Sequence, residues 1–281
     1  MNTELRDFLQ SRRARLTPGE VGLPERGRRR VAGLRREEVA QLAGVSTDYY
    51  VRLEQGRGPH VSDQVLDAVG RALRLEPTEL AHLYALARPP RRRAAPRGPR
   101  PVRRSLRLML DGMAGPALIS DYTTTVLAAN ELARAVFGFD DRSRDRARHF
   151  FLAPAARDFY PNWAEDAHTL VAELRLQTGR RPDDPRLTAL VGELSIKSDE
   201  FRELWAKHPV RQKTAGRKTL LHPDVGLLEL SYDRMTLADD NDAQLYVYTV
   251  EPGSESAERL ALLASWHATA PESPAIGADR P

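Results

Sequence analysis

The sequence predicts two domains of different class: an all-α N-terminal domain of five helices and an α+β C-terminal domain built on an antiparallel five-stranded sheet. Three observations lead to this prediction. Residues 1–88 carry apolar residues at helical spacing. Residues 88–104 hold eight Arg and five Pro. Residues 105–253 show two strand patterns, a helical block and then three more strand patterns.

The N-terminal helices are expected near residues 4–15, 35–43, 46–54, 62–74 and 76–87. Gly44 separates the second helix from the third, as a tight turn requires, and Ser46 is placed to cap the third helix. Residues 16–34 contain two Pro and four Gly, so a loop is expected there. Helix, glycine turn and helix over residues 35–56 form the helix-turn-helix arrangement, which places its second helix in the major groove of DNA.

Residues 1–88 resemble the helix-turn-helix domain of the Xre/phage-repressor family. The resemblance is carried by Val39-Ala40, Gly44-Val45-Ser46, Tyr50, Leu53, Glu54 and Gly56. It also implies a structural ion pair between Arg13 and Glu54, for which the alternative is two solvated surface charges. For the helix-turn-helix segment itself, the alternative is a helical hairpin with no role in DNA binding.

On the third helix, Tyr50 and Leu53 are expected to face the core, with the opposite side facing DNA. The resemblance matches Thr47, Asp48 and Arg52 to positions that touch base edges. Arg52 can donate two hydrogen bonds to guanine, and Asp48 can accept a hydrogen bond from the amino group of cytosine. Thr47 can contact the methyl group of thymine. The full predicted DNA-binding set is Arg36, Ser46, Thr47, Asp48, Tyr49, Arg52, Gln55 and Arg57.

Several members of this set have roles other than base reading. Arg36 and Gln55 match phosphate-clamping positions, and Arg57 adds positive charge beside them. Tyr49 is larger than the residue usual at its position, so its contact, to backbone or base, is open. The loop arginines at 26, 28, 29 and 30 form either a basic arm along the phosphates or a solvated loop.

Charge is divided unevenly along the chain. Residues 1–104 hold 22 Lys+Arg against 12 Asp+Glu, a net charge of +10, and the remainder holds 21 against 27, a net charge of −6. A basic part that faces double-stranded DNA and an acidic second domain are therefore expected. The chain has no cysteine, which excludes disulfides and metal-thiolate sites, and no metal or cofactor is expected. It shows no signal peptide and no membrane-spanning run, so a cytoplasmic protein is expected.

The expected domains are residues 1–88, a linker over 89–104, a second domain over 105–253, and a tail over 254–281 that is helical and then disordered. Within the second domain, a helix is expected at 106–113, followed by strands at 117–121 and 125–129. Helices are expected at 130–137, 150–178 and 186–207, and strands at 218–222, 227–234 and 244–250. We expect the helices to cover one face of the sheet.

This order of elements resembles PAS-like sensor domains and, more specifically, the ligand-binding domain of MmyB-like transcription regulators. The motifs that carry the resemblance are residues 127–130 (LAAN), 159–163 (FYPNW), 184–187 (DPRL), 198–201 (SDEF), 204–205 (LW), 216–218 (GRK), 222–223 (HP) and Gly226. One departure is Arg148-His149, where the family commonly has Arg-Asn. The resemblance implies a pocket for a small apolar molecule, with a long-chain fatty acid as the suggested type.

The residues expected at this ligand site are aromatic or polar: Asn130, His149, Phe150, Phe159, Tyr160, Trp163 and Trp205. The alternative is that the aromatic residues are ordinary core. A carboxylate ligand would need a cation, for which Arg148, Arg175 and Lys218 are the candidates.

The sequence therefore predicts a sequence-specific DNA-binding transcription regulator whose second domain senses a small apolar ligand. We expect a homodimer on an inverted repeat, because one such unit covers a single half-site. The alternative is a DNA-binding regulator whose second domain only dimerises. The chain has no HExxH, GxSxG, P-loop or GxGxxG motif, so no enzyme is expected.

Overall fold

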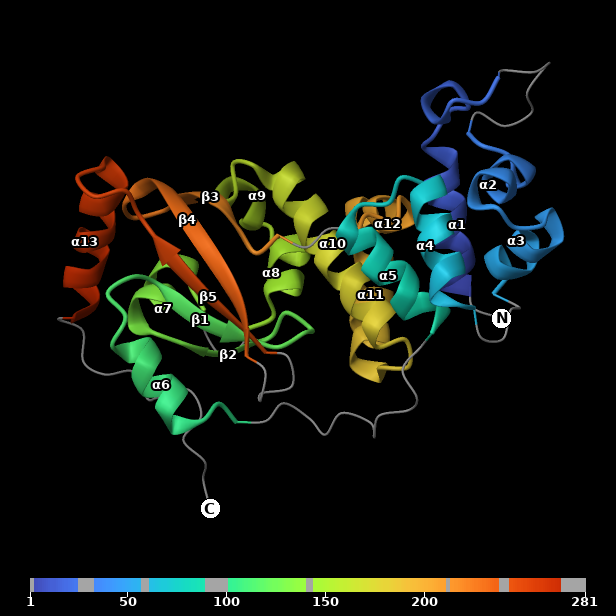
Figure 1. Cartoon of the computed structure of the whole chain (residues 1–281). Coiled ribbons are helices and arrows are strands. Elements are labelled where there is room, and N and C mark those ends of the chain that lie inside the picture. Colours follow the sequence, from blue (N-terminus) through green and yellow to red (C-terminus); the bar gives the residue numbers. More distant parts are fainter. Residues whose placement is uncertain are drawn as a thin grey trace. The chain divides into compact units, whose positions relative to one another are not determined.

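The computed structural model describes residues 3–24, 33–56, 61–88, 101–139, 144–210, 213–237 and 243–268 (Figure 1). These residues form two compact units. The first unit contains Met1–Ala95, Val171–Pro185 and Glu203–Gln212, and the second contains Pro96–Leu170, Arg186–Arg202 and Lys213–Pro281. The N-terminal helices thus fold together with two segments from much later in the chain.

Five α-helices form the N-terminal part of the first unit. They are α1 (Thr3–Ala14), α2 (Arg36–Ala43), α3 (Thr47–Glu54), α4 (Asp63–Ala72) and α5 (Pro77–Ala87). The prediction of five helices is confirmed, and each predicted end lies within two residues of the observed one. The predicted loop over residues 16–34 contains a short 3-10 helix at Gly19–Val21.

The turn between α2 and α3 has the geometry that its residues favour. Gly44 ends α2 in the left-handed conformation, with φ of 67°, which a side chain would disfavour. The Ser46 hydroxyl then accepts a hydrogen bond from the backbone N–H of Tyr49 at 3.2 Å and caps α3. Together these two residues fix where α2 stops and α3 begins.

The core of the first unit joins distant parts of the sequence. Phe8, Tyr50 and Leu66 are fully buried in it, and Leu176 and Val210 lie in the same core. Leu176 belongs to α10 (Trp163–Arg180), and Val210 follows α12 (Asp199–Ala206). Part of the apolar surface of the N-terminal helices is therefore covered by residues more than eighty positions beyond the end of α5.

The second unit is built on a five-stranded sheet with strand order β2-β1-β5-β4-β3. The strands are β1 (Ala117–Ser120), β2 (Val126–Ala129), β3 (Ala215–His222), β4 (Gly226–Leu237) and β5 (Ala243–Thr249). Every neighbouring pair is antiparallel, which confirms the predicted sheet.

The remaining helices are α6 (Arg104–Asp111), α7 (Glu131–Phe137), α8 (Arg146–Leu152), α9 (Ala156–Phe159), α11 (Pro185–Lys197) and α13 (Glu255–Ala268). The prediction of one continuous helix over residues 150–178 is wrong. Pro154 and Pro161 lie between α8, α9 and α10, and proline is not accommodated in a helix interior. The expected helix over residues 186–207 is also divided, at Ser198, whose hydroxyl accepts from the N–H of Phe201 at 3.2 Å.

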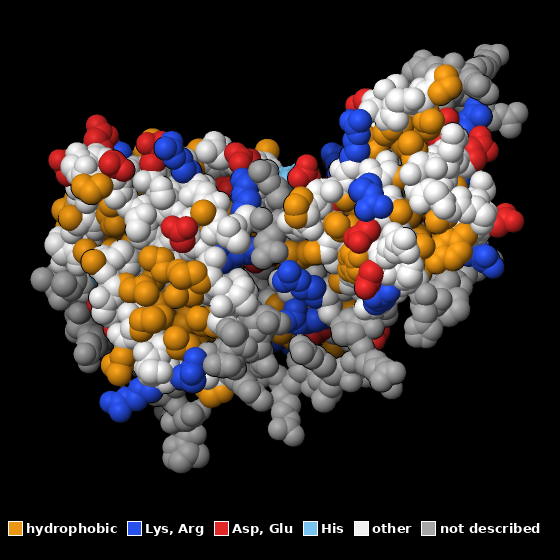
Figure 2. Space-filling view, in the orientation of Figure 1, with side chains coloured by type: hydrophobic (Ala, Val, Ile, Leu, Met, Phe, Trp, Pro, Cys, Tyr) orange, Lys and Arg blue, Asp and Glu red, His pale blue; other side chains and the backbone are white. Residues whose placement is uncertain are grey.

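Helices cover both faces of the sheet, so the expectation of one covered face is wrong. Leu110 of α6 packs with Ile119 and Leu245. Successive strand residues point to opposite faces, and Tyr248 contacts Phe137 of α7 on the other side, with ring centroids 4.9 Å apart. Figure 2 shows apolar side chains gathered on part of the second unit's surface; Leu108 and Met109 of α6 are among the exposed large apolar residues.

The side chain of His82 is buried in the first unit in its neutral form. His82 of α5 is 1% exposed, and its ring packs edge-on against the ring of Phe8, with ring centroids 5.1 Å apart. Burial, together with the positive charges of Arg175, Arg12, His208 and Arg180, lowers the pKa of His82 to about 3. Between about pH 3 and pH 6.5, the His82 side chain is therefore protonated in the unfolded chain and neutral in the folded chain.

We predict that acid destabilises this unit through His82. Its lowered pKa contributes stability that is present above about pH 6.5 and lost as pH falls toward 3, about 2 kcal/mol between pH 7 and pH 5. In urea unfolding, His82→Leu should lose less free energy of unfolding over that interval than the unsubstituted chain. His267→Gln, on the exposed end of α13, is the control and should leave the pH dependence unchanged. Equal pH dependence in His82→Leu and the unsubstituted chain would refute the assignment.

Candidate functional site

A fully buried carboxylate positions α3. The side chain of Glu54, at the end of α3, is 0% exposed. It accepts from Arg13 of α1 at 3.3 Å, from Arg36 of α2 at 2.8 Å and from Gln10 of α1 at 3.3 Å. The predicted Arg13–Glu54 ion pair is confirmed. Because three helices meet at one carboxylate, the orientation of α3 is fixed from its buried side.

The opposite side of α3 is open to solvent. Tyr50 and Leu53 are buried, as predicted. The other members of the predicted reading set on or beside α3 are exposed (Ser46, Thr47, Asp48, Arg52) or half-buried (Tyr49, Gln55). Their individual contacts to DNA stay predictions. Arg57 and the arginines at 26, 28, 29 and 30 lie outside the described residues.

Arg36 has a structural role in addition to the phosphate contact predicted for it. Its guanidinium pairs with Glu54, and its side chain stays partly exposed. Removing Arg36 would therefore also take one cation away from a buried carboxylate. Its phosphate contact stays a prediction.

Four of the seven predicted ligand residues form one aromatic cluster in the second unit. Phe150 stacks on Trp163, with centroids 5.2 Å apart and planes 14° apart. Tyr160 lies 4.9 Å from both Phe150 and Phe159. The cluster comes from α8, α9 and the start of α10, which the two proline breaks turn against one another. We call Phe150, Phe159, Tyr160 and Trp163 the aromatic cluster.

The structure places two of the other three predicted residues apart from this cluster. Trp205 lies in the first unit, with its ring 3.6 Å from the guanidinium carbon of Arg175. Asn130 caps α7: its side-chain oxygen accepts from the N–H of Ala133 at 2.9 Å and of Ala117 at 3.0 Å, and its amide nitrogen donates to Gly115 O at 2.8 Å. His149 is half-buried on α8, next to Phe150 in sequence.

Lys218 of β3 brings a positive charge to the aromatic cluster. Its ammonium lies 4.6 Å from the Tyr160 ring and 5.8 Å from the Phe150 ring, and pairs with Asp166 of α10 at 2.9 Å. Burial lowers the pKa of Lys218, and Asp166 opposes this shift. Burial also raises the pKa of the Tyr160 hydroxyl, which therefore stays protonated and able to donate.

Three charged residues near the aromatic cluster were missed in the sequence. Arg157 of α9 lies 4.0 Å over the Trp163 ring. Arg146 of α8 lies 4.3 Å over the Tyr246 ring and contributes to the pKa of Lys218, and Asp166 pairs with Lys218. Strand alternation could have placed Lys218 on the inner face, because Leu220 and His222 at the same parity are buried. No local pattern pairs a residue of α10 with a residue of β3.

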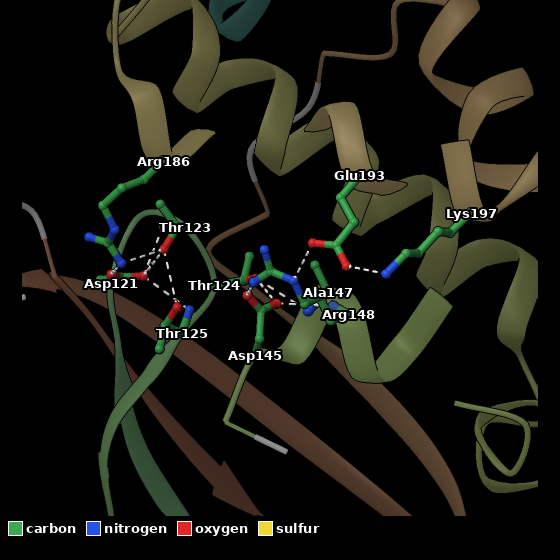
Figure 3. Close-up of polar contacts among 10 residues, drawn as sticks. All are labelled: Asp121, Thr123, Thr124, Thr125, Asp145, Ala147, Arg148, Arg186, Glu193 and Lys197. Atoms are coloured by element: carbon green, nitrogen blue, oxygen red, sulfur yellow. Dashed lines mark hydrogen bonds and ion pairs between the residues drawn. The ribbon is translucent and has the colours of Figure 1, made fainter. Parts of the chain in front are cut away.

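The other two candidate cations are held elsewhere. Arg148 pairs with Asp145 and, at 2.8 Å, with Glu193 of α11, as Figure 3 shows. Arg175 pairs with Glu4 at 2.8 Å in the first unit. Of the three candidates, Lys218 is the one placed over the rings of the aromatic cluster.

The turn between β1 and β2 is fixed by a second buried carboxylate. Asp121 accepts from the N–H groups of Thr123 at 2.9 Å and Thr125 at 3.0 Å, and from Arg186 of α11 at 2.6 Å (Figure 3). The turn holds Thr124 at a φ of 68°, which is rare for a β-branched residue. The Thr124 hydroxyl accepts from the N–H of Ala147 at 3.2 Å, so the same turn also holds the start of α8.

The described part of the chain lacks a membrane-spanning helix and a metal-binding cluster. None of its helices combines the length and the apolar character needed to cross a bilayer. Among the same residues, no cluster of three or more His, Asp or Glu side chains could hold a metal ion.

Two stretches of the sequence match known families. Residues 102–263 match the family described as MmyB-like transcription regulator ligand binding domain. Residues 4–83 match a family described as helix-turn-helix domain. No curated protein matched the chain.

We predict that Glu54→Gln lowers the free energy of unfolding by about 3 kcal/mol, because it removes the buried charge that three helices share. Urea unfolding measures the loss. The control is Glu37→Gln, which removes an exposed carboxylate of α2 that pairs with Arg35 and should cost less than about 1 kcal/mol. Similar losses for the two variants would show that Glu54 does not organise these helices.

Proposed function

We propose a function for this chain from its family, since it belongs to the family with an MmyB-like transcription regulator ligand binding domain. In this proposal α3 reads DNA, and binding of a carboxylate-bearing apolar ligand changes the affinity of the chain for DNA. It is a transcription regulator with a helix-turn-helix DNA-binding domain and a ligand-binding domain. The finer proposal concerns which bases are read, which ligand is bound and the state of assembly.

The reading role of α3 is supported by its two-sided character. Glu54 anchors one side, and Thr47, Asp48 and Arg52 are exposed on the other. An arginine in the major groove can donate two hydrogen bonds to guanine. We propose that two copies of the chain bind an inverted repeat, because a single α3 spans only one half-site.

The ligand class is supported by Lys218 over the aromatic cluster, which is the observation that carries this proposal. Aromatic rings suit an alkyl chain, and an ammonium suits a carboxylate. A long-chain fatty acid has both parts. Its carboxylate would compete with Asp166 for Lys218, and the Tyr160 hydroxyl is available as a donor because it stays protonated.

A second candidate is a C-terminal domain that dimerises and binds no ligand. Exposed Leu108 and Met109 of α6 and Trp266 of α13 favour it, because large apolar residues on a surface are typical of interfaces. The two candidates differ in whether extraction of the purified chain releases a small molecule that mass spectrometry detects.

We predict that Arg52→Ala relaxes base choice at one position in each half-site, since a bidentate arginine–guanine contact discriminates by about 1–3 kcal/mol. Selection from random DNA, followed by sequencing, measures the preference. Arg71→Ala, on the exposed side of α4, is the matched control and should keep the selected site. Arg36→Ala is unsuitable as a control because Arg36 also pairs with Glu54.

If Arg52→Ala selects the same site as the unsubstituted chain, Arg52 does not read a base. If the unsubstituted chain selects single sites that lack two-fold symmetry, the proposed dimer on an inverted repeat is wrong.

We predict that Lys218→Met weakens binding of myristate by about tenfold or more, because it removes the cation and leaves the Asp166 carboxylate near the ligand's own. Tryptophan fluorescence of the full chain follows the titration. Lys197→Met, which removes an exposed lysine that pairs with Glu193, is the control and should bind as the unsubstituted chain does.

Titration with methyl myristate tests the charge directly. The unsubstituted chain should prefer the acid, and Lys218→Met should lose that preference. A preference that survives in Lys218→Met would place the carboxylate elsewhere.

A further inference from the structure

Two segments of the ligand-binding family match complete the DNA-reading unit. Val171–Pro185 and Glu203–Gln212 lie within residues 102–263, yet they fold into the first unit. Leu176 and Val210 are buried with the residues of α1, α3 and α4. Helix α10 begins in the second unit at Trp163 and ends in the first at Arg180, so one helix belongs to both units.

Two arginines are buried where these segments meet α1 and α5. The side chains of Arg12 and Arg175 are each 2% exposed. Arg12 of α1 pairs with Glu79 of α5 at 3.0 Å, and Arg175 of α10 pairs with Glu4 of α1 at 2.8 Å. We call these four residues the arginine joint.

The same two guanidiniums donate to carbonyls in the last turn of α12 and just beyond it. Arg12 donates to the carbonyl of His208 at 2.8 Å, and Arg175 donates to the carbonyl of Trp205. The last carbonyls of a helix have no partner within it and carry partial negative charge, which suits a cation. Arg175 thereby links α10 to α1 and α12 at once.

Repulsion between the two guanidiniums and attraction to their carboxylates act together in the arginine joint. Burial, opposed by Glu79 and assisted by the charges of Arg15 and Arg175, lowers the pKa of Arg12 to about 10. The two arginines thus repel each other while each is held by its own carboxylate. Next to them, a Cβ on Gly179 would lie 2.2 Å from Cε1 of His82, so α10 approaches α5 too closely for any other residue without movement.

Buried ion pairs of this kind contribute little net stability, since apolar residues of similar volume often serve as well. Their geometric demands are strict, however, because a cation shifted from its carboxylate stays buried without compensation. A displacement of α10 would therefore be felt at α1, which contacts α3 through Glu54.

We propose that the arginine joint transmits changes between α10 and the DNA-reading helices, so that binding of DNA and the state of α10 are coupled. This inference rests on the proposed function in that the first unit must bind DNA. It does not require the ligand to be a fatty acid. Coupling of this kind is reciprocal, so DNA should alter the second-unit part of α10 without any ligand.

The test is hydrogen–deuterium exchange of the full chain with and without saturating DNA that carries the selected site. In the unsubstituted chain, DNA should change the exchange rate of amides at 163–170 by at least threefold. In Arg175→Met, saturated with the same DNA, that change should disappear. The control is Arg202→Met, which removes an exposed arginine of α12 that pairs with Asp199 and should transmit as the unsubstituted chain does.

Glu4→Gln provides a second variant in case Arg175→Met does not fold, since Glu4 is 41% exposed and tolerates change more readily. It should reduce the response in the same direction. A response at 163–170 that survives in both variants, or that is absent in the unsubstituted chain bound to DNA, would overturn the proposal. Failure to bind DNA would overturn the proposed function as well, and anisotropy of labelled DNA detects it separately.

Discussion

The cost of removing a charge from water shapes both units of this chain. Glu54 is fully buried and draws Arg13 and Arg36 to it. Arg12 and Arg175 are buried and draw in Glu79 and Glu4. In each case the partner comes from another helix, so compensating the charge also fixes how the helices are arranged. Apolar contacts fill the core of the first unit, and the paired charges add a geometric requirement on the helices that carry them.

Function follows from where this compensation is made. The cations that hold Glu54 approach α3 from its buried side, which leaves Thr47 and Arg52 on the exposed side. In the second unit, the Lys218–Asp166 pair lies against aromatic rings, and there we propose that a ligand carboxylate replaces Asp166. Under this proposal, the paired charge of the second unit serves recognition, whereas the enclosed Glu54 serves architecture.

Local patterns in the sequence predicted the helices and strands but did not predict some of the contacts between them. Apolar spacing, Gly44 and Ser46 predicted α1 to α5, and segments rich in β-branched and aromatic residues between turns predicted the sheet. The breaks at Pro154 and Pro161 followed from proline chemistry and were overlooked. The position of Trp205 in a helix can be predicted from the sequence, but its contact with Arg175 cannot. That contact depends on how α10 and α12 pack, which no local pattern in the sequence encodes. The interior position of Lys218, by contrast, follows from its parity with Leu220.

The buried positions of Leu176 and Val210 bear on how this kind of protein can be recombined. Domains are exchanged, in evolution and in engineering, by cutting at linkers where few contacts cross. Here a cut between residues 88 and 104 would separate α1 to α5 from two segments that complete their core. A chimaera made at that point would carry an uncovered apolar surface, and Glu4 would lose its partner Arg175. The DNA reader of this chain can move to a new partner intact only with α10 and the end of α12 attached.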